Sequence, residues 1–173
     1  MPVTREEWAL AYAAQARSDF VVYKILVQLN SIEDCHRLHY LQMACEKIAK
    51  AYRLRDTEAS VEQSLTSHRA FSNFIVIYCR ATEVVKRYKG RNKLLLRITR
   101  TAKLLARDIE RLAPAIDREN TPQNAEYPWL DNGKIISPCQ YDFSSLWRLQ
   151  TPEGVQFLRF IETAFSDFDE IRL

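Results

Sequence analysis

The sequence has few of the residues that make tight turns. It contains 3 glycines in 173 residues, and glycine is the residue that most readily takes the positive φ of many tight turns. The shortage argues against a sheet-rich fold and favours helices. The length is enough for one domain with a full hydrophobic core and too short for two ordinary ones. We therefore expect a single, mainly helical domain that covers residues 1–173.

The chain also lacks the apolar run of roughly 18 to 20 residues that a membrane span needs. Its first residues, Met1 to Glu7, have neither the charged start nor the apolar centre of a signal peptide. Charged residues make up 27% of the chain and hydrophobic residues 47%, which is typical of a folded globular protein. We expect a cytoplasmic protein with no membrane contact.

Cysteine spacing gives no metal-binding motif. Cys35, Cys45, Cys79 and Cys139 form no C-x-x-C pair, and three of them lie in helical patterns beside apolar residues, which predicts free buried thiols. His36 and His39 are three residues apart, but no cysteine or carboxylate recurs at ligand spacing to complete a tetrahedral zinc site. We expect no metal and no cofactor.

Apolar spacing and capping residues predict five helices. Thr4 and Glu7 form a capping box at the start of the first helix, and Ser31, Ser67 and Thr151 are the predicted N-caps of three others. The fourth helix carries Pro114 in its last turn, which predicts a kink or an early stop. The predicted ranges are about 4–29, 32–55, 68–88 and 92–116, with a last helix that begins at Pro152.

The sequence becomes irregular after Ile116. Glu126–Leu130 and Lys134–Ser137 flank an Asn-Gly turn, which favours a small hairpin. We predict an all-α, up-and-down antiparallel bundle of four to five helices (about 4–116), followed by a C-terminal cover segment (about 117–173). Five aromatic residues of that segment either extend the core or form a contact surface: Tyr127, Trp129, Tyr141, Phe143 and Trp147.

The strongest charge imbalance lies between Lys86 and Arg107, which holds nine basic residues and no acidic one. In the predicted helix from Asn92, the basic side chains lie opposite an apolar stripe and face outward. They are Lys93, Arg97, Arg100, Lys103, Arg107 and Arg111.

An outward row of one sign repels itself by roughly a few tenths of a kcal/mol per neighbouring pair. It therefore favours a polyanion such as RNA, bound through phosphates without base readout. Stacking aromatics are missing from this row. Two other interpretations stay open: a solvated face balanced by acidic residues elsewhere, since the net charge is only +3, and a docking face for an acidic protein.

The predicted second helix carries two stripes. One is apolar and predicts core; the other is a row of polar side chains, namely His39, Gln42, Glu46 and Lys50. Asp19 in the first helix and His68 near the start of the third are candidates to join that row. The six residues form either a buried network that fixes the register between helices or a site for an anionic ligand.

Three stretches of the chain resemble one family. They are Gln15–Phe20, Cys35–Lys47 and Ser67–Phe71. Together, over roughly residues 8–116, they resemble the HEPN (higher eukaryotes and prokaryotes nucleotide-binding) family, most specifically in the Leu-His-Tyr-Leu-Gln and Glu-Lys pattern of the second stretch. The resemblance implies a bundle of four or five helices and a homodimer. The family includes toxin ribonucleases of bacterial defence systems, proteins paired with minimal nucleotidyltransferases, and binding domains without catalysis.

The sequence departs from the ribonuclease members of that family. Those carry an arginine, four to six arbitrary residues and then a histidine, whereas His36, His39 and His68 have no arginine at that spacing. No catalytic pair can be carried over. The sequence therefore favours a non-catalytic module that binds RNA, a nucleotide or another anionic ligand, or that pairs with a nucleotidyltransferase-type protein in a bacterial defence or toxin-antitoxin setting. Two alternatives stay open: a HEPN ribonuclease with an atypical site, and a purely protein-protein interaction domain.

Overall fold

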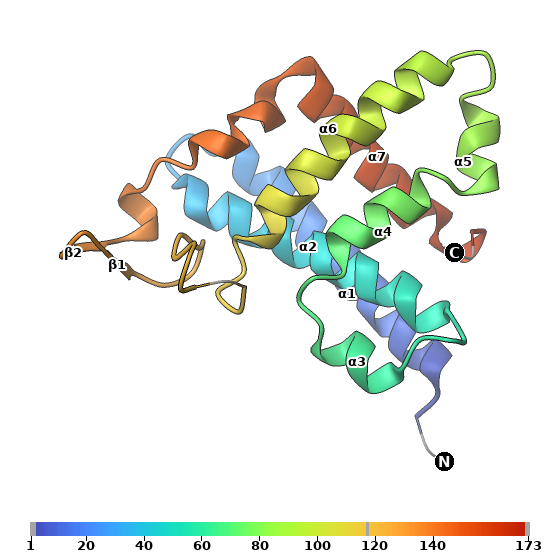
Figure 1. The fold of residues 1–173 in the computed structure, drawn as a ribbon, viewed down its shortest axis with the longest axis horizontal. Coiled ribbons are helices and arrows are strands. Elements are labelled where there is room, and N and C mark those ends of the chain that lie inside the picture. The colour runs from blue at the N-terminus through green and yellow to red at the C-terminus, as the bar shows by residue number, and fades with distance from the viewer. Residues whose placement is uncertain (1–2, 117, 172–173) are drawn as a thin grey trace.

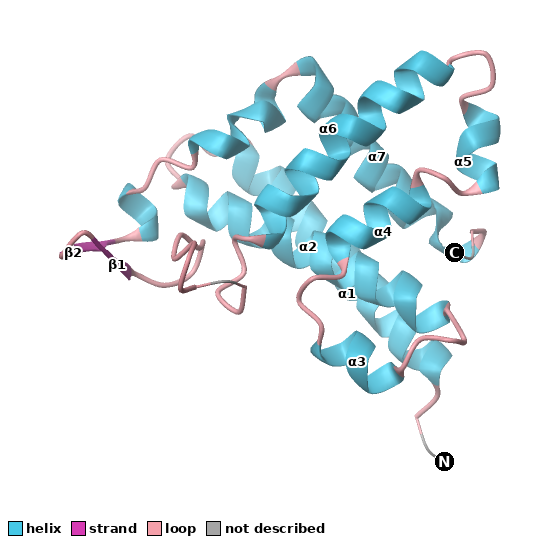
Figure 2. Ribbon diagram, in the orientation of Figure 1, coloured by secondary structure: helices cyan, strands magenta, loops and turns pink. Residues whose placement is uncertain are grey.

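The structure, a computed structural model, describes residues 3–116 and 118–171. These residues form an all-α helical bundle with an irregular C-terminal segment, as predicted (Figures 1 and 2). The α-helices are α1 (Arg5–Val27), α2 (Asp34–Arg55), α3 (Val61–Thr66), α4 (Phe71–Tyr78), α5 (Thr82–Arg87), α6 (Asn92–Glu110) and α7 (Pro152–Ser166). The remaining elements are β1 (Trp129–Asp131), β2 (Lys134–Ile136) and the 3-10 helices η1 (Pro138–Gln140), η2 (Ser144–Gln150) and η3 (Asp167–Asp169).

Helices α1 and α2 form a hairpin and lie side by side (Figure 1). The predicted capping box at Thr4 and Glu7 is present, since each side chain accepts a hydrogen bond from the other residue's backbone N–H. Small residues on α1, such as the fully buried Ala9 and Ala16, let α2 approach closely. The predicted cap at Ser31 is wrong, because α2 begins at Asp34 and its N-cap residue makes no side-chain hydrogen bond.

The single helix predicted from His68 to Tyr88 is in fact two helices, α4 and α5, and Ser67 caps neither of them. In an unbroken helix Val85 would share the apolar face of Phe71 and Tyr78. The break after Tyr78 turns the chain, so that Val84 is 1% exposed and Val85 is 43% exposed. The first turn of α4 is capped from a distance: the backbone N–H of Ser72 donates to Glu110 of α6 at 2.9 Å.

Helix α6 ends at Glu110, six residues before the predicted end at Ile116. Pro114 explains the early stop, because proline has no N–H to donate to the carbonyl of Glu110 and disfavours helical backbone in the residue before it. Gly90 takes a φ of +80° between α5 and α6, a backbone conformation that glycine adopts readily.

The predicted hairpin is present but shorter than predicted, with Trp129 opposite Ile136 and Asp131 opposite Lys134. Asn132 and Gly133 both have positive φ, as an Asn-Gly turn between two strands requires. The predicted cap of the last helix is also present, because Thr151 Oγ1 accepts from the backbone N–H of Gly154 at 3.2 Å.

Helix α7 packs behind α6 (Figure 1) and shares one hydrophobic core with α2, α4 and α6. Fully buried residues of α7, such as Phe157 and Ile161, belong to the same core as Tyr52 of α2 and Leu105 of α6. The core therefore continues past residue 116 into the last helix. Among the described residues, no helix combines the length and the apolar character that crossing a bilayer requires.

We expect Gly154→Ala to destabilise the protein. A Cβ at this position would lie 2.0 Å from the carbonyl oxygen of Arg148 and 2.5 Å from the Cα of Leu149, so the backbone of η2 would have to move away. Urea denaturation should show a free energy of unfolding lower by about 1–3 kcal/mol. The control is Val155→Ala, a surface change on the same helix, for which we expect about 0.5 kcal/mol or less. Equal stability of the two variants contradicts the prediction.

Candidate functional site

The structure brings four of the six predicted cluster residues together around Glu46. Gln42 Nε2 donates to Glu46 Oε2 at 2.8 Å, and Lys50 Nζ lies 2.8 Å from Glu46 Oε1. His68 Nδ1 lies 3.2 Å from the same oxygen. Lys50 also donates to the backbone carbonyl of Leu65, at the end of α3, at 2.8 Å. This Glu46 network joins α2 to α3 and to the segment before α4.

The Glu46 network is mostly shielded from water. The side chains of Glu46 and Lys50 are 12% and 6% exposed, and only that of His68 reaches the surface, at 45%. Burial by itself would raise the pKa of Glu46, but the hydrogen bond and charge of Lys50, with smaller contributions from His68 and Gln42, hold that pKa below its usual value. A closed and satisfied network of this kind fits a structural role in fixing the helices against one another.

The other two predicted cluster residues lie elsewhere. Asp19, 5% exposed, accepts hydrogen bonds from Lys47 at 2.6 Å and from Gln15 at 2.9 Å. His39 Nδ1 lies 3.5 Å from Glu126 Oε1, beside the C-terminal segment, and makes no hydrogen bond within the described part of the chain. The six predicted residues are therefore divided among three separate contacts and do not form one cluster.

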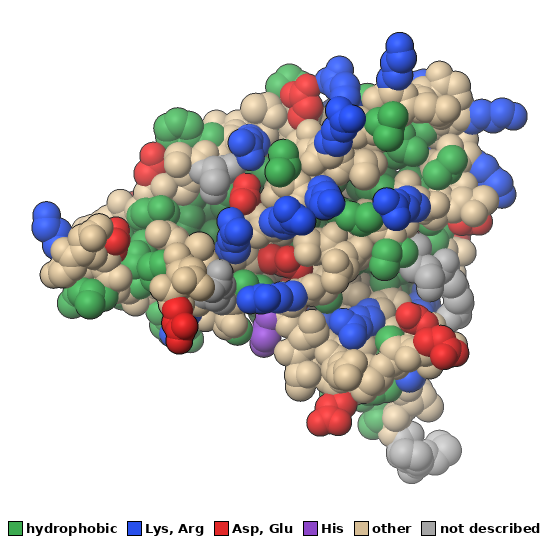
Figure 3. Space-filling view, in the orientation of Figure 1, with side chains coloured by type: hydrophobic (Ala, Val, Ile, Leu, Met, Phe, Trp, Pro, Cys, Tyr) green, Lys and Arg blue, Asp and Glu red, His purple; other side chains and the backbone are tan. Residues whose placement is uncertain are grey.

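The basic row predicted on the fourth helix faces solvent along α6. Lys93, Arg100, Lys103 and Arg107 are exposed, and none of them makes an ion pair with another described residue. Arg97 differs from them, because its Nη2 lies 2.7 Å from Glu153 of α7. Figure 3 shows Lys and Arg side chains spread over α6 and continuing across the face that α4 and α3 present.

Two leucines that were not predicted to be exposed also lie on the basic face of α6. Leu96 is 60% exposed and Leu104 is 51% exposed. The spacing of α6 places them within the arc of basic residues that runs from Lys103 to Arg97. The angular position of each leucine around the helix would have predicted this exposure. The signal is easy to overlook, because both leucines stand next to other leucines that belong to the apolar stripe.

Two hollows lie beside α4, next to the basic face, and we call them together the groove. A hollow of about 400 Å³ lies between α4 and α6 and is lined by Lys103, Arg107, Asn73 and Ile77, among others. A second cavity, of about 430 Å³, lies between α4, α3 and the end of α2, and is also lined by Asn73 and Ile77. The two hollows therefore meet on the outer side of α4.

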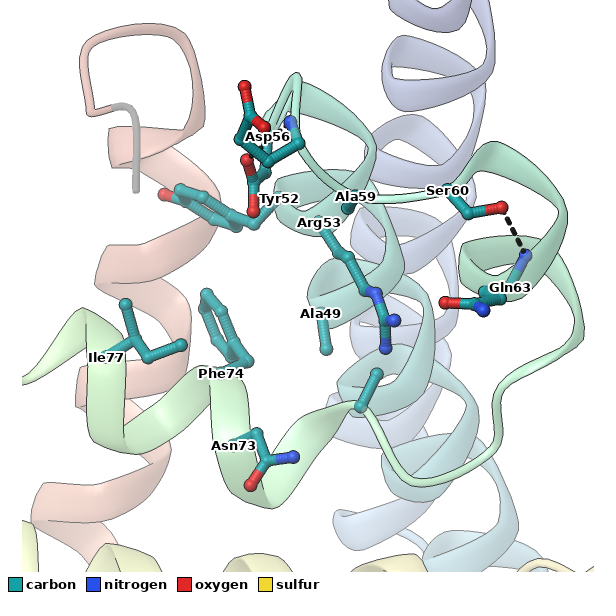
Figure 4. A pocket seen from close by; sticks show the side chains of 12 residues that line it. Ala49, Tyr52, Arg53, Asp56, Ala59, Ser60, Gln63, Asn73, Phe74 and Ile77 are labelled. Atoms are coloured by element: carbon teal, nitrogen blue, oxygen red, sulfur yellow. Dashed lines mark hydrogen bonds between the residues drawn. The ribbon is translucent and has the colours of Figure 1, made fainter.

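The second cavity is lined by a basic side chain, that of Arg53, which was not predicted as a site residue. Figure 4 shows the Arg53 side chain extending into it, between the turn formed by Ser60 and Gln63 and the side chain of Asn73. Arg53 makes no ion pair with another residue that the structure describes. Nothing in the pattern of α2 distinguishes Arg53 from the other basic residues near the end of that helix, so only the fold identifies it.

The aromatic residues of the C-terminal segment are divided between core and surface. Trp129 and Phe143 are buried, and Tyr141 lies between them, with ring centroids 5.0 and 4.9 Å away. Tyr127 and Trp147 are 54% and 59% exposed. Three of the five aromatic residues therefore extend the core, and the other two lie at the surface.

Comparison with protein-family models, with curated proteins and with solved structures finds no match to this chain. The case for a function therefore depends on the geometry described above.

We expect Glu46→Gln to destabilise the protein most at neutral pH. The substitution leaves Lys50 buried without its counter-charge, which costs about 3 kcal/mol when a buried pair loses one member. Because the pKa of Glu46 is lower in the folded chain than in the unfolded chain, its contribution is complete above the unfolded pKa and is lost as the pH falls through the folded pKa.

The measurement is urea denaturation of the wild type and of Glu46→Gln at a series of pH values. The difference in unfolding free energy should be largest near neutral pH and should shrink in acid. Glu62→Gln, an exposed change on α3, is the control and should have little effect. A difference that stays constant with pH contradicts the assigned role of Glu46.

Proposed function

We propose that this protein is a non-catalytic, HEPN-like helical module that binds RNA through phosphate contacts made by the outward face of α6. The observation that carries the proposal is the row of four exposed cations, Lys93, Arg100, Lys103 and Arg107, that lack ion pairs within the described residues. A solvated face balanced by distant acidic residues stays the alternative, since the net charge of the chain is only +3, and the RNA-binding test below distinguishes the two.

The dimensions of the row suit a polyanion. From Lys93 to Arg107 the helix advances about 21 Å, at about 1.5 Å per residue, and the four cations lie on one side of it. Neighbouring like charges on a helix repel each other, so a bound chain of phosphates relieves the repulsion and releases its own counterions. The groove beside α4 adjoins this surface and holds Arg53 at its far side, where Asp56 and Glu58 also line it.

The binding surface offers phosphate contacts and little base recognition. The aromatic residues beside the groove, Tyr52 and Phe74, are 1% and 5% exposed, so they present no free ring face on which bases could stack. We therefore infer affinity for RNA with weak sequence preference.

The histidines support a binding role better than a catalytic one. His68 is directed at the carboxylate of Glu46, and His39 lies beside Glu126. Neither contact places a histidine beside an arginine, as the ribonuclease members of the resembled family require. Homodimer formation, and pairing with a nucleotidyltransferase-type protein in a bacterial defence or toxin-antitoxin setting, stay predictions of the family resemblance.

The test is binding of a fluorescein-labelled RNA, measured by fluorescence anisotropy at salt concentrations between about 50 and 200 mM. Four phosphate contacts predict a slope of about −3 in a plot of log affinity against log salt concentration. In Arg100→Glu/Lys103→Glu, we expect the slope to fall by about half and the affinity at low salt to drop roughly tenfold, because two phosphate contacts are lost.

Two control variants separate the α6 face from net charge. Lys134→Glu/Arg159→Glu makes the same change in net charge at exposed positions outside α6 and should bind RNA with a nearly unchanged slope. Leu96→Asn/Leu104→Asn changes the same face without changing its charge, and should also leave RNA affinity unchanged if contact is through phosphates. Equal losses in the first control and in the α6 variant would overturn the proposal, as would affinity that does not depend on salt.

The same RNA tests the catalytic alternative. The purified protein should leave the labelled RNA intact on a denaturing gel. Cleavage that disappears in His68→Ala or His39→Ala, with binding retained, would replace the non-catalytic proposal by an atypical ribonuclease.

A further inference from the structure

The fold brings together three metal-ligating side chains that are far apart in the sequence. Cys35 and His36 lie in the first turn of α2, and Cys139 lies in η1, 104 residues after Cys35. Their ligand atoms all lie within 4.8 Å of one another. No metal was predicted, because no cysteine or carboxylate recurs at ligand spacing along the sequence; the tertiary structure supplies a further ligand from the C-terminal segment.

The distance between the two sulfur atoms suits a shared zinc ion. Cys35 Sγ and Cys139 Sγ are 3.6 Å apart. Two thiolates on one tetrahedral zinc, each about 2.3 Å from the metal, are separated by about 3.8 Å. Both cysteines are free thiols, since a disulfide needs a separation of about 2.05 Å. His36 and Cys139 are exposed while Cys35 is buried, so an ion can enter from solvent.

We propose that Cys35, His36 and Cys139 bind a Zn²⁺ ion, with the fourth coordination position open to water. Two thiolates and a neutral imidazole are the donors that zinc prefers, and the two thiolate charges balance the charge of the ion. Magnesium and calcium do not suit the site, because it offers no oxygen ligand among these three residues.

The expected consequence of zinc is a link between α2 and the C-terminal segment. Helix α2 and η1 are in contact, but η1 follows a segment with little regular structure between α6 and α7. An ion that binds the folded chain better than the unfolded chain raises its stability by mass action. This inference is independent of RNA binding, because the three ligands do not lie on α6.

The test uses the full chain, reduced and treated with chelator. Zn²⁺ affinity and stoichiometry are measured by competition with a chromophoric chelator, and Co²⁺ serves as a spectroscopic probe of thiolate coordination. We expect one ion per chain, a thiolate-to-cobalt charge-transfer band, and a rise in melting temperature when zinc is added. Cys139→Ser and Cys35→Ser should abolish the band and the rise in melting temperature, and His36→Ala should weaken binding by roughly tenfold or more.

Matched controls keep the outcome interpretable. Cys139 and His36 are exposed, so substitutions there should leave the fold intact, which circular dichroism can check. Cys79→Ala removes a buried thiol from outside the cluster and should bind zinc as the wild type does. The proposal is overturned by the absence of stoichiometric zinc binding, or by wild-type binding in Cys139→Ser. It is also overturned if a Cys35–Cys139 disulfide forms on mild oxidation while the reduced chain binds no metal.

Discussion

Helix α2 is buried on nearly all sides, and the rest of the structure is arranged around it. It contacts α1, α3, α4, α6, α7 and η1. A helix in that position has to bury polar side chains as well as apolar ones, and buried polar groups are stable only when they have partners. Lys50 finds its partners in Glu46 and the end of α3. Arg55, 4% exposed at its side chain, pairs with Glu6 of α1 and donates to the carbonyl of Phe168 in η3.

This constraint explains why the polar stripe of α2 is scaffold and not a pocket. Three polar residues of the stripe contact different neighbouring elements: Glu46 the segment before α4, Lys50 the end of α3, and His39 the segment after α6, while Gln42 donates to Glu46 within α2. Gln42, Glu46 and Lys50 use their hydrogen-bonding groups inside the fold, whereas His39 Nδ1 has no hydrogen-bond partner among the described residues. The basic side chains of α6 are not used in packing, because that helix lies at the surface and packs through one face only. Their charge is therefore available to a ligand.

The features that follow from short stretches of sequence were predicted well. The capping box at Thr4, the cap at Thr151 and the Asn-Gly hairpin each depend on residues within a few positions of one another, and the structure has all three. Features that depend on distant partners were predicted poorly. The chain breaks after Tyr78 although no glycine or proline stands there, and Glu110 supplies the cap of α4 that Ser67 was predicted to provide.

The sequence by itself determined the all-α class, the helical pairing of α1 with α2, and the basic face of α6, because helical periodicity and capping are local properties of the chain. Only the tertiary structure decided which polar residues of α2 have a structural role. It also decided that the Arg53 side chain lines a cavity and that Cys139 lies beside Cys35. These outcomes depend on the packing of elements that are far apart in the chain. The spacing of residues along the chain does not predict such contacts, since they form only when the apolar faces of several helices meet in one core.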